Sequence, residues 1–315
     1  MRDKEGRAIE YLRLSVTDRC NCRCTYCMAA DGVPMLSHSD ICSFEEFVRI
    51  TRATCELGVR KVRLTGGEPL ARLGIVDLVG MLRAIPGVEE LDMTTNATLL
   101  APIASDLRSA GLDRLNVSLD SLDPARYEKI TRRGHLADAL AGLEAARAAG
   151  FTGTKLNCVL MGGVNDRDVP RLAALARDHP VDVRFIELMP MGPAACWPRA
   201  RFMNAETVLE AVPELVCVDH DGVAELFSAP GWAGRVGLIR PMSCRFCAGC
   251  TRIRVTADGR LKPCLHSATE VNLRGLDEQG LHEALLAGIA AKPAHHSMDE
   301  AHVSESLRAM NEIGG

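Results

Sequence analysis

Three cysteines near the start of the chain have the spacing of a metal site. Cys20, Cys24 and Cys27 form the pattern Cys-x3-Cys-x2-Cys within the run DRCNCRCTYCM. Iron-sulfur clusters are usually held by four thiolates, so a four-iron cluster held by three would leave one iron open to a substrate or cofactor. An open coordination position is typical of catalytic metal sites. The run also contains Cys22, which leaves a fully ligated cluster or a zinc site as alternatives.

A second cysteine group lies near the C-terminal end of the chain. Cys247, Cys250 and Cys264 form Cys-x2-Cys-x13-Cys, and Cys244 is available as a fourth ligand. Four thiolates would suit a structural zinc ion, whereas three would suit a second cluster with an open iron. Eight of the thirteen cysteines fall into these two groups, so metal ligation explains them better than a disulfide framework.

Composition limits the classes of partner and the cellular compartment. The 315 residues carry a net charge of -4, so no overall basic field supports a nucleic-acid or anionic-membrane partner. We recognise no signal segment and no membrane span, and abundant thiols favour the reducing cytoplasm. The nine histidines are scattered, and we interpret His295 and His296 as a surface pair. Monomer and homodimer both stay open.

Apolar runs of strand length alternate with helical patterns over the first 190 residues. Strands are expected near 12–17, 60–65, 90–95, 114–119, 154–160 and 182–188, and helices at 74–84, 100–110, 135–149 and 168–178. Another helix should begin after Ser43, because Glu46 completes a capping box. This order predicts an α/β fold, an incomplete six-stranded parallel (βα) barrel. Residues 191–315 should form a smaller α+β extension that covers the open side, with a hairpin turn at Asp258-Gly259.

Strand residues alternate between an apolar and a polar face. In the first strand Leu12 and Leu14 share one face, and Arg13 and Ser15 share the other. The next three strands repeat this division. Helices cover the outside of a parallel barrel, so the polar faces should point into the lumen and bind a polar ligand. The alternative is that these side chains neutralise one another or face water at an open edge.

Several cations fall on the polar faces. They are Arg13, Lys61, Arg63 and Lys155, with Arg184 as a further candidate. Arg252 and Arg254 share a face beside Cys250, although a solvated surface position would also explain them. Cations that converge on one cavity suit a polyanion such as a nucleoside triphosphate, because guanidinium groups match phosphate oxygens.

A glycine turn, TGGEPL, follows the second strand. Gly66 and Gly67 would let a ligand approach the backbone, and Glu68 offers a carboxylate. The turn lacks the Gly-Lys-Ser/Thr ending of a phosphate-binding P-loop. It lies at the carboxyl end of a barrel strand, where the active sites of barrel enzymes lie.

The first cysteine group, Tyr26, the GGEP turn and the polar-faced barrel together resemble the radical S-adenosylmethionine (SAM) enzymes. A wider set of motifs resembles the branch that converts GTP to 3′,8-cyclo-7,8-dihydro-GTP in the first step of molybdenum cofactor biosynthesis. These motifs are YLRLSVTDRCNCRCTYCM, VRLTGGEPL, NVSLDSLDP, ITRRG, KLNCVLMGGVND, RFIELMPMG, CAGCTRIRVTADGRLKPCL and the final IGG. The resemblance extends from about Arg13 to Gly315. Three positions depart from the family pattern: Cys22 is usually aromatic, Thr251 is usually Asn, and Ala97 is usually Gly.

The resemblance implies a role for each matching residue. Cys20, Cys24 and Cys27 would hold a radical-generating [4Fe-4S] cluster that binds SAM, and Cys247, Cys250 and Cys264 a second [4Fe-4S] cluster that meets the guanine of GTP. SAM would contact Tyr26, Gly67, Ser118 and Met189. GTP would contact Arg13, Lys61, Arg63, Thr94, Lys155, Arg184, Arg252, Ile253 and Arg254. Gly314, Gly315, Arg252 and Arg254 are expected to be catalytic.

Two further partners are implied, a low-potential electron donor of the flavodoxin or ferredoxin type and the next enzyme of the pathway. The alternative function is a peptide-modifying radical SAM enzyme with an auxiliary cluster. Such an enzyme needs neither the cationic lumen nor the Gly-Gly end.

Overall fold

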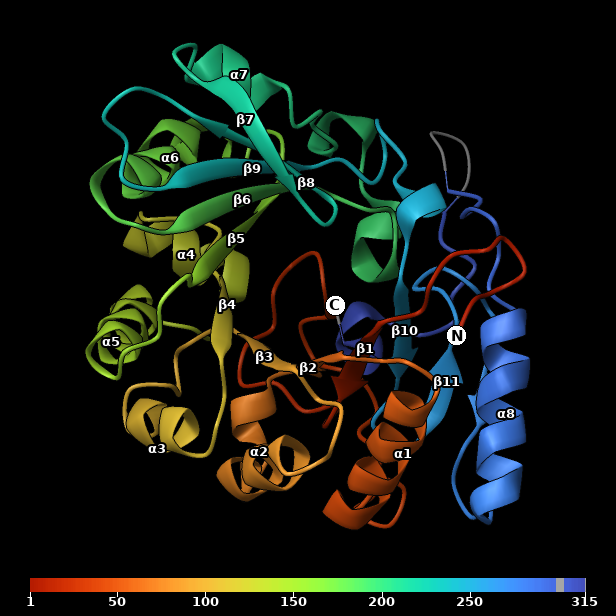
Figure 1. The fold of residues 1–315 in the computed structure, drawn as a ribbon. Helices are drawn as coiled ribbons and strands as arrows, with labels where there is room; N and C mark the ends of the chain where they lie inside the picture. The colour runs from red at the N-terminus through yellow and green to blue at the C-terminus, as the bar shows by residue number, and fades with distance from the viewer. Residues whose placement is uncertain (299–302, 315) are drawn as a thin grey trace.

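A curved sheet with helices on its outer face forms the framework of the protein (Figure 1). The computed structural model describes residues 1–298 and 303–314. Its six central strands lie side by side in chain order and pair in parallel, as the sequence predicts. They are β1 (Tyr11–Ser15), β2 (Lys61–Thr65), β3 (Glu90–Thr95), β4 (Arg114–Ser118), β5 (Lys155–Leu160) and β6 (Asp182–Glu187).

Six helices connect or follow these strands. They are α1 (Phe44–Glu56), α2 (Ile75–Arg83), α3 (Ala104–Ser109), α4 (Pro124–Thr131), α5 (Leu136–Ala148) and α6 (Val169–Asp178). The capping box at Ser43 and Glu46 is confirmed. Helix α3 begins four residues later than expected. Helix α4 is absent from the sequence-based assignment, although Asp123 caps it through Arg126 N at 2.8 Å and Pro124 occupies its first turn.

The core lies between the sheet and the helices. Leu12, Leu14, Val62, Leu64 and Leu91 are all fully buried on the helix side of their strands. Burying one such side chain contributes about 1.5–3 kcal/mol, so the apolar half of the alternation fixes which strand face points outward. The polar half must then face the inside of the curve.

The C-terminal part continues the same sheet at both edges. At one edge β10 (Arg252–Val255) pairs in parallel with β1, and at the other β9 (Arg235–Ile239) pairs in parallel with β6. The C-terminal part thus adds strands on each side of the opening, and other residues of this part line the cavity. The remaining strands are β7 (Val216–Asp221), β8 (Ala224–Ser228), β11 (Arg260–Lys262) and β12 (Val271–Asn272). The predicted hairpin turn is confirmed between β10 and β11, where Gly259 has φ +75°.

Short helices complete the chain. The α-helices are α7 (Thr207–Ala211), α8 (Glu278–Ala290) and α9 (Met310–Ile313). The 3-10 turns are Pro69–Ala71, Asp166–Asp168, Gly192–Cys196, Arg199–Arg201 and Cys247–Gly249. Figure 1 shows the C-terminal end inside the curve of the sheet, not on the outer surface.

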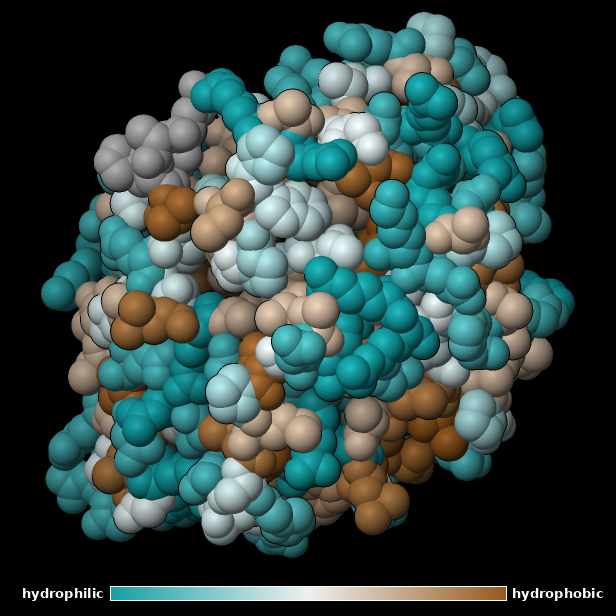
Figure 2. Space-filling view, turned by 180° about the vertical axis from the view of Figure 1, so that it is seen from behind, coloured by the Kyte–Doolittle hydropathy of each residue, from teal (hydrophilic) through white to brown (hydrophobic). Residues whose placement is uncertain are grey.

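Among the described residues, no helix is both long and apolar enough to cross a membrane. The face in Figure 2 carries mainly hydrophilic and intermediate side chains, with hydrophobic ones in scattered groups.

Candidate active site

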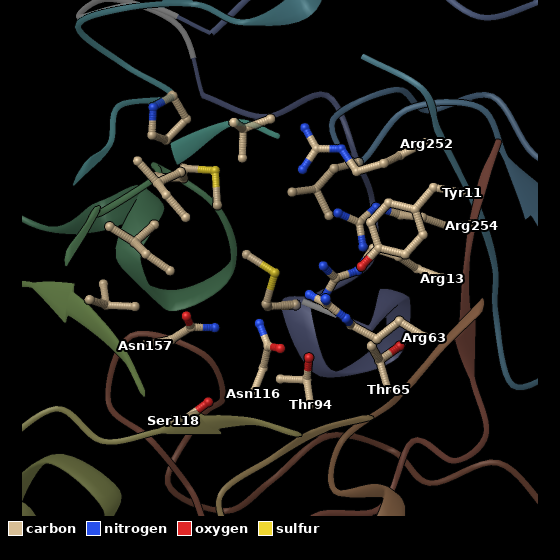
Figure 3. Close-up of a pocket in the computed structure, with 18 of the residues that line it drawn as sticks. Tyr11, Arg13, Arg63, Thr65, Thr94, Asn116, Ser118, Asn157, Arg252 and Arg254 are labelled. Atoms are coloured by element: carbon tan, nitrogen blue, oxygen red, sulfur yellow. The ribbon is translucent and has the colours of Figure 1, made fainter. Parts of the chain in front are cut away.

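The inside of the curved sheet is a polar cavity of about 680 Å³. Thr94, Asn116, Ser118 and Asn157 line one side of it, and the arginines of β1, β2 and β10 line another (Figure 3). The polar faces that strand alternation predicts for the first four strands supply Arg13, Arg63, Thr94, Asn116 and Ser118 to this lining, so that prediction is confirmed. The lumen is therefore built to surround a polar ligand rather than to form a packed barrel core.

Both predicted cysteine groups line this one cavity. Cys20, Cys24 and Cys27 come from the loop after β1, and Cys247, Cys250 and Cys264 come from the C-terminal part. Cys244 is exposed and lies outside the cavity lining. Across residues 1–298 and 303–314, no three side chains of ligand type surround a single ion site.

The thiols of Cys24 and Cys27 in the first group have raised pKa values. Burial raises the pKa of Cys24 well above its usual value and, together with Cys20, raises the pKa of Cys27 to about 12. Metal ligation requires thiolates, so these partly buried and crowded sulfurs would need a cationic centre to ionise. An iron-sulfur cluster would supply that centre.

Cys22 lines the same cavity as the other cysteines of its loop. It is buried, its backbone N–H donates to Cys20 Sγ at 3.3 Å, and its own sulfur accepts from Asn96 Nδ2 at 3.5 Å. A Cβ on Gly134 would lie 3.1 Å from this sulfur, so little room remains for a larger side chain.

The glycine turn after β2 holds the cysteine loop. A Cβ on Gly66 would overlap the carbonyl oxygen of Thr17, and one on Gly67 that of Arg19. Gly67 N donates to Thr17 O at 2.8 Å, and Glu68 N donates to Arg19 O at 2.8 Å. The expectation that both glycines make room for a ligand is therefore incomplete, because their missing side chains first admit the neighbouring backbone.

Glu68 also acts within the protein. Its buried carboxylate accepts bonds from Asn96 N at 2.8 Å, Thr95 Oγ1 at 2.7 Å and Leu70 N at 3.0 Å. Burial raises the pKa of Glu68 to about 7 despite these bonds. The carboxylate thus ties the turn to the end of β3 instead of presenting a free anion.

The residues that the resemblance assigns to SAM lie along the same cavity. Tyr26, Gly67, Ser118 and Met189 all contribute to its lining. The hydroxyl of Tyr26 donates to Asp120 Oδ2 at 2.9 Å, which fixes the ring beside the first cysteine group. Their contacts with SAM stay predictions.

The second cysteine group has a cationic environment. Lys292 Nζ donates to the carbonyls of Arg252 at 2.7 Å and Pro263 at 2.8 Å, and so joins the segments that carry Cys250 and Cys264. Burial acts to raise the pKa of Cys250, but Arg252 and Lys292 outweigh it and lower that pKa to about 6. The lowered pKa favours the thiolate form of this sulfur.

The lumen cations divide into two groups by their carboxylate partners. Lys61 and Arg63 pair with Asp92 of β3 at 3.0 and 2.7 Å. Lys155 pairs with Asp221 at 2.5 Å, and Arg184 pairs with the same carboxylate. All of these cations line the cavity.

Arg13 and Arg254 lie close to other cations in the cavity. Burial, with Arg63 and Arg252 nearby, lowers the pKa of Arg13 to about 10. Burial, then Arg13 and Arg252, lower the pKa of Arg254 well below its usual value. Crowded cations of this kind lose repulsion energy when an anion enters. The cavity therefore favours a polyanion.

Buried polar atoms in the lumen also lack partners. Arg63 Nε, Arg184 Nε, Thr94 Oγ1 and Asn157 Oδ1 make no hydrogen bond within the described part of the chain. Leaving a buried polar group unsatisfied costs about 1–3 kcal/mol. These atoms are therefore available to a ligand with several donors and acceptors.

The C-terminal tail enters the cavity between the arginines. The carbonyl of Gly314 accepts bonds from Arg254 Nη1 at 2.6 Å and Arg13 Nε at 3.3 Å. Gly314 has φ +76°, and a Cβ there would overlap Thr65 Oγ1. Only glycine therefore fits this position without displacing the tail. Gly315, the other predicted catalytic glycine, lies outside the described residues.

The side chain of one predicted substrate residue lies outside the cavity lining, and several lining residues were not predicted from the sequence. Ile253 is fully buried on the apolar face of β10, away from the lining. His296, interpreted as a surface residue, is buried and packs edge-on against His266 at 5.2 Å. Further lining residues that sequence reasoning missed are Tyr11, Asp221, Phe246, Lys292 and Asn311.

Ala97 shows the cost of a departure from the family pattern. Its φ is +60°, in the left-handed region that favours glycine. Thr95 Oγ1 accepts its N–H at 3.0 Å and Gly142 packs directly on its carbonyl, which together hold this conformation.

A partial parallel barrel with three cavity-lining cysteines after its first strand defines a radical SAM protein. Residues 14–176 match the radical SAM superfamily, and residues 181–298 match the family described as Molybdenum Cofactor Synthesis C. The chain belongs to the radical SAM superfamily and, by the full-length relatives that follow, to its GTP 3′,8-cyclase family.

Relatives named GTP 3′,8-cyclase match this chain along its length. The protein from Peptoclostridium acidaminophilum is 45% identical over 322 residues, which cover 99% of this chain and 98% of the relative. The protein from Alkaliphilus metalliredigens is 44% identical, with all of both chains covered. The protein from Moorella thermoacetica is 45% identical, again with full coverage.

Solved structures share the fold at low sequence identity. SuiB from Streptococcus suis, bound to S-adenosylmethionine, has a TM-score of 0.68 at 15% identity, covering 90% of this chain and 68% of that one. Methylornithine synthase has a TM-score of 0.53 at 15% identity, covering 65% of this chain and 62% of that one. Both likenesses concern the fold alone.

Proposed function

We propose that this protein is a radical SAM cyclase that converts GTP to 3′,8-cyclo-7,8-dihydro-GTP, the first step of molybdenum cofactor biosynthesis. The observation that supports this proposal most strongly is that two groups of three cysteines and seven cations line one cavity. The Gly314 carbonyl accepts hydrogen bonds from two of those cations, Arg13 and Arg254. The cations are Arg13, Lys61, Arg63, Lys155, Arg184, Arg252 and Arg254.

Two [4Fe-4S] clusters complete the proposed site. Cys20, Cys24 and Cys27 would hold the first beside SAM, and Cys247, Cys250 and Cys264 would hold the second beside the guanine of GTP. When bound and reduced, the first cluster and SAM supply the radical that removes the ribose 3′ hydrogen. Every other requirement falls on the protein's own side chains.

The lumen residues would bind and orient the substrate. Guanidinium and ammonium groups offset the triphosphate charge, and unpartnered donors and acceptors such as Thr94 Oγ1 fix its orientation. Holding the ribose carbon and guanine C8 near each other converts ring closure into a positioned intramolecular step. The tail glycine brings a main-chain carbonyl to the arginines where a larger residue would block the channel.

The remaining partners follow from this reaction. A low-potential donor of the flavodoxin or ferredoxin type would supply electrons, and the next enzyme of the pathway would take the product. Such chemistry suits a reducing cytoplasm. The lumen is crowded with cations that match phosphate groups, and a peptide-modifying enzyme does not need them. No observation specifically favours that alternative.

An anaerobic assay tests the proposal. The protein is reconstituted with iron and sulfide, reduced, and given SAM with or without GTP. We expect about eight irons per chain and 5′-deoxyadenosine formation coupled to GTP loss. Two bound zinc ions, or SAM cleavage that is indifferent to GTP, would contradict the proposal.

A further inference from the structure

The carboxylate of Asp221 joins two cations that the proposed function assigns to GTP. Its Oδ2 contacts Lys155 Nζ at 2.5 Å and also contacts Arg184 Nη2. Lys155 and Arg184 lie on neighbouring strands β5 and β6, and each side chain is only 8% exposed. One carboxylate oxygen therefore stands where two buried cations converge.

Asp221 comes from a peripheral element. It is the last residue of β7, the edge strand of the sheet, and its side chain is 44% exposed. Gly222, with φ +63°, begins the tight turn into β8. Figure 1 shows this hairpin at one end of the curved sheet, while Asp221, Gly222 and Val223 also line the cavity. The carboxylate can leave the cations without a change in the central strands.

The other lumen cations are paired differently. Lys61 and Arg63 contact Asp92, which is fully buried within β3 and fixed by the central sheet. A phosphate group entering there cannot displace its carboxylate. Among the pairs described for Lys61, Arg63, Lys155 and Arg184, only those made by Asp221 involve a half-exposed hairpin residue.

Carboxylate and phosphate oxygens are interchangeable partners for such cations. A guanidinium and an ammonium bind either anion by the same charge-assisted hydrogen bonds. Partial burial opposes ionisation of Asp221, yet Lys155 and Arg184 hold its pKa well below the usual range. The carboxylate is thus an anion throughout the neutral range and competes with any other anion at this position.

We propose that Asp221 is a specificity-determining residue, an inference that rests on the proposed function. In the free enzyme its carboxylate occupies a phosphate subsite, and a phosphate group of GTP displaces it from there. A phosphate that reaches Lys155 and Arg184 replaces the lost carboxylate contacts. A guanosine ligand without phosphates cannot replace them. Asp221 therefore disfavours ligands that carry too little negative charge to replace its carboxylate. The protein discriminates between GTP and guanosine by this competition.

Isothermal titration of the reconstituted, anaerobic protein with GTP and with guanosine tests this inference. Asp221→Asn keeps the side-chain shape and removes the competing charge. We expect GTP to bind about fivefold more tightly, the scale of a half-exposed ion pair, and guanosine binding to stay unchanged. Asp219→Asn is the matched control, because Asp219 lies on the same strand, is 64% exposed and contacts Arg235 at 3.8 Å instead.

The outcomes separate the inference from the function beneath it. Equal or weaker GTP binding by Asp221→Asn would overturn the inference while leaving the proposed function intact. An equal gain for guanosine, or the same gain for Asp219→Asn, would also overturn it. A parent protein that binds no GTP would remove the proposed function and this inference together. Asp221→Ala should repeat the Asp221→Asn result, which guards against an effect peculiar to the amide.

Discussion

Substitution of Gly314 by alanine perturbs the tail at one defined point. The added Cβ would overlap Thr65 Oγ1, and the backbone already has φ +76°. A left-handed conformation costs an alanine about 1–2 kcal/mol. Overpacking against a buried side chain adds about 1–3 kcal/mol. The docked tail should therefore lose about 2–5 kcal/mol, or at least about thirtyfold in its docking equilibrium.

This loss is comparable with what holds the tail in place. Hydrogen bonds to charged donors contribute about 1.5–3 kcal/mol each, and the Gly314 carbonyl accepts two of them, from Arg13 and Arg254. We expect Gly314→Ala to undock the tail and to reduce GTP conversion by more than about tenfold, from the same free-energy estimate. The melting temperature and iron content should stay unchanged, because the sheet does not depend on the tail.

The assay compares product formation, iron content and thermal unfolding for the variant and a control. Gly80→Ala is the matched control, since Gly80 lies in α2 with open space where a Cβ would be added. That variant should keep full activity. Full activity of Gly314→Ala would show instead that the docked tail takes no part in turnover.

Three further predictions follow from the same site. Arg254→Ala should weaken GTP binding by about ten- to a hundredfold in a titration, since truncation removes a buried charged contact. Its iron content should stay constant. Unchanged affinity would mean that the phosphates bind elsewhere. Cys247→Ala should lower the iron content by about four per chain and Cys244→Ala should not, because Cys244 lies outside the cavity; equal losses would make Cys244 a ligand. Burial and Arg184 lower the pKa of Lys155 to about 8, so its ammonium is present below that pH and lost above it. GTP affinity should thus be level near pH 7 and fall above pH 8, and Lys155→Arg should remove the fall; a decline that persists in this variant would assign it to another group.

Strand alternation predicts the barrel and its lumen because both depend on local periodicity. Arg13, Arg63 and Thr94 point inward since Leu12, Leu64 and Met93 must point outward, and no long-range information is needed for that conclusion. Ile253 obeys the same rule. Its apolar neighbours place it in the core, and only the family resemblance suggested otherwise.

Long-range pairing is what the sequence does not reveal. No local pattern shows that β10 lies beside β1 or that β9 lies beside β6. Asp221 reaches the lumen only through such pairing, and as one residue of an exposed strand it resembles a solvated charge. His296 is similar, because its burial depends on packing against His266. Helix α4 is different, because the Asp123 cap and Pro124 are local signals that the sequence itself contains.

In the proposed site, one cavity brings GTP to the radical that the first cluster and SAM would supply. GTP carrying deuterium at the ribose 3′ carbon tests it in a single turnover, with mass spectrometry of the 5′-deoxyadenosine formed. The proposed function predicts transfer of one deuterium into 5′-deoxyadenosine. Unlabelled 5′-deoxyadenosine, formed while GTP is consumed, would contradict it.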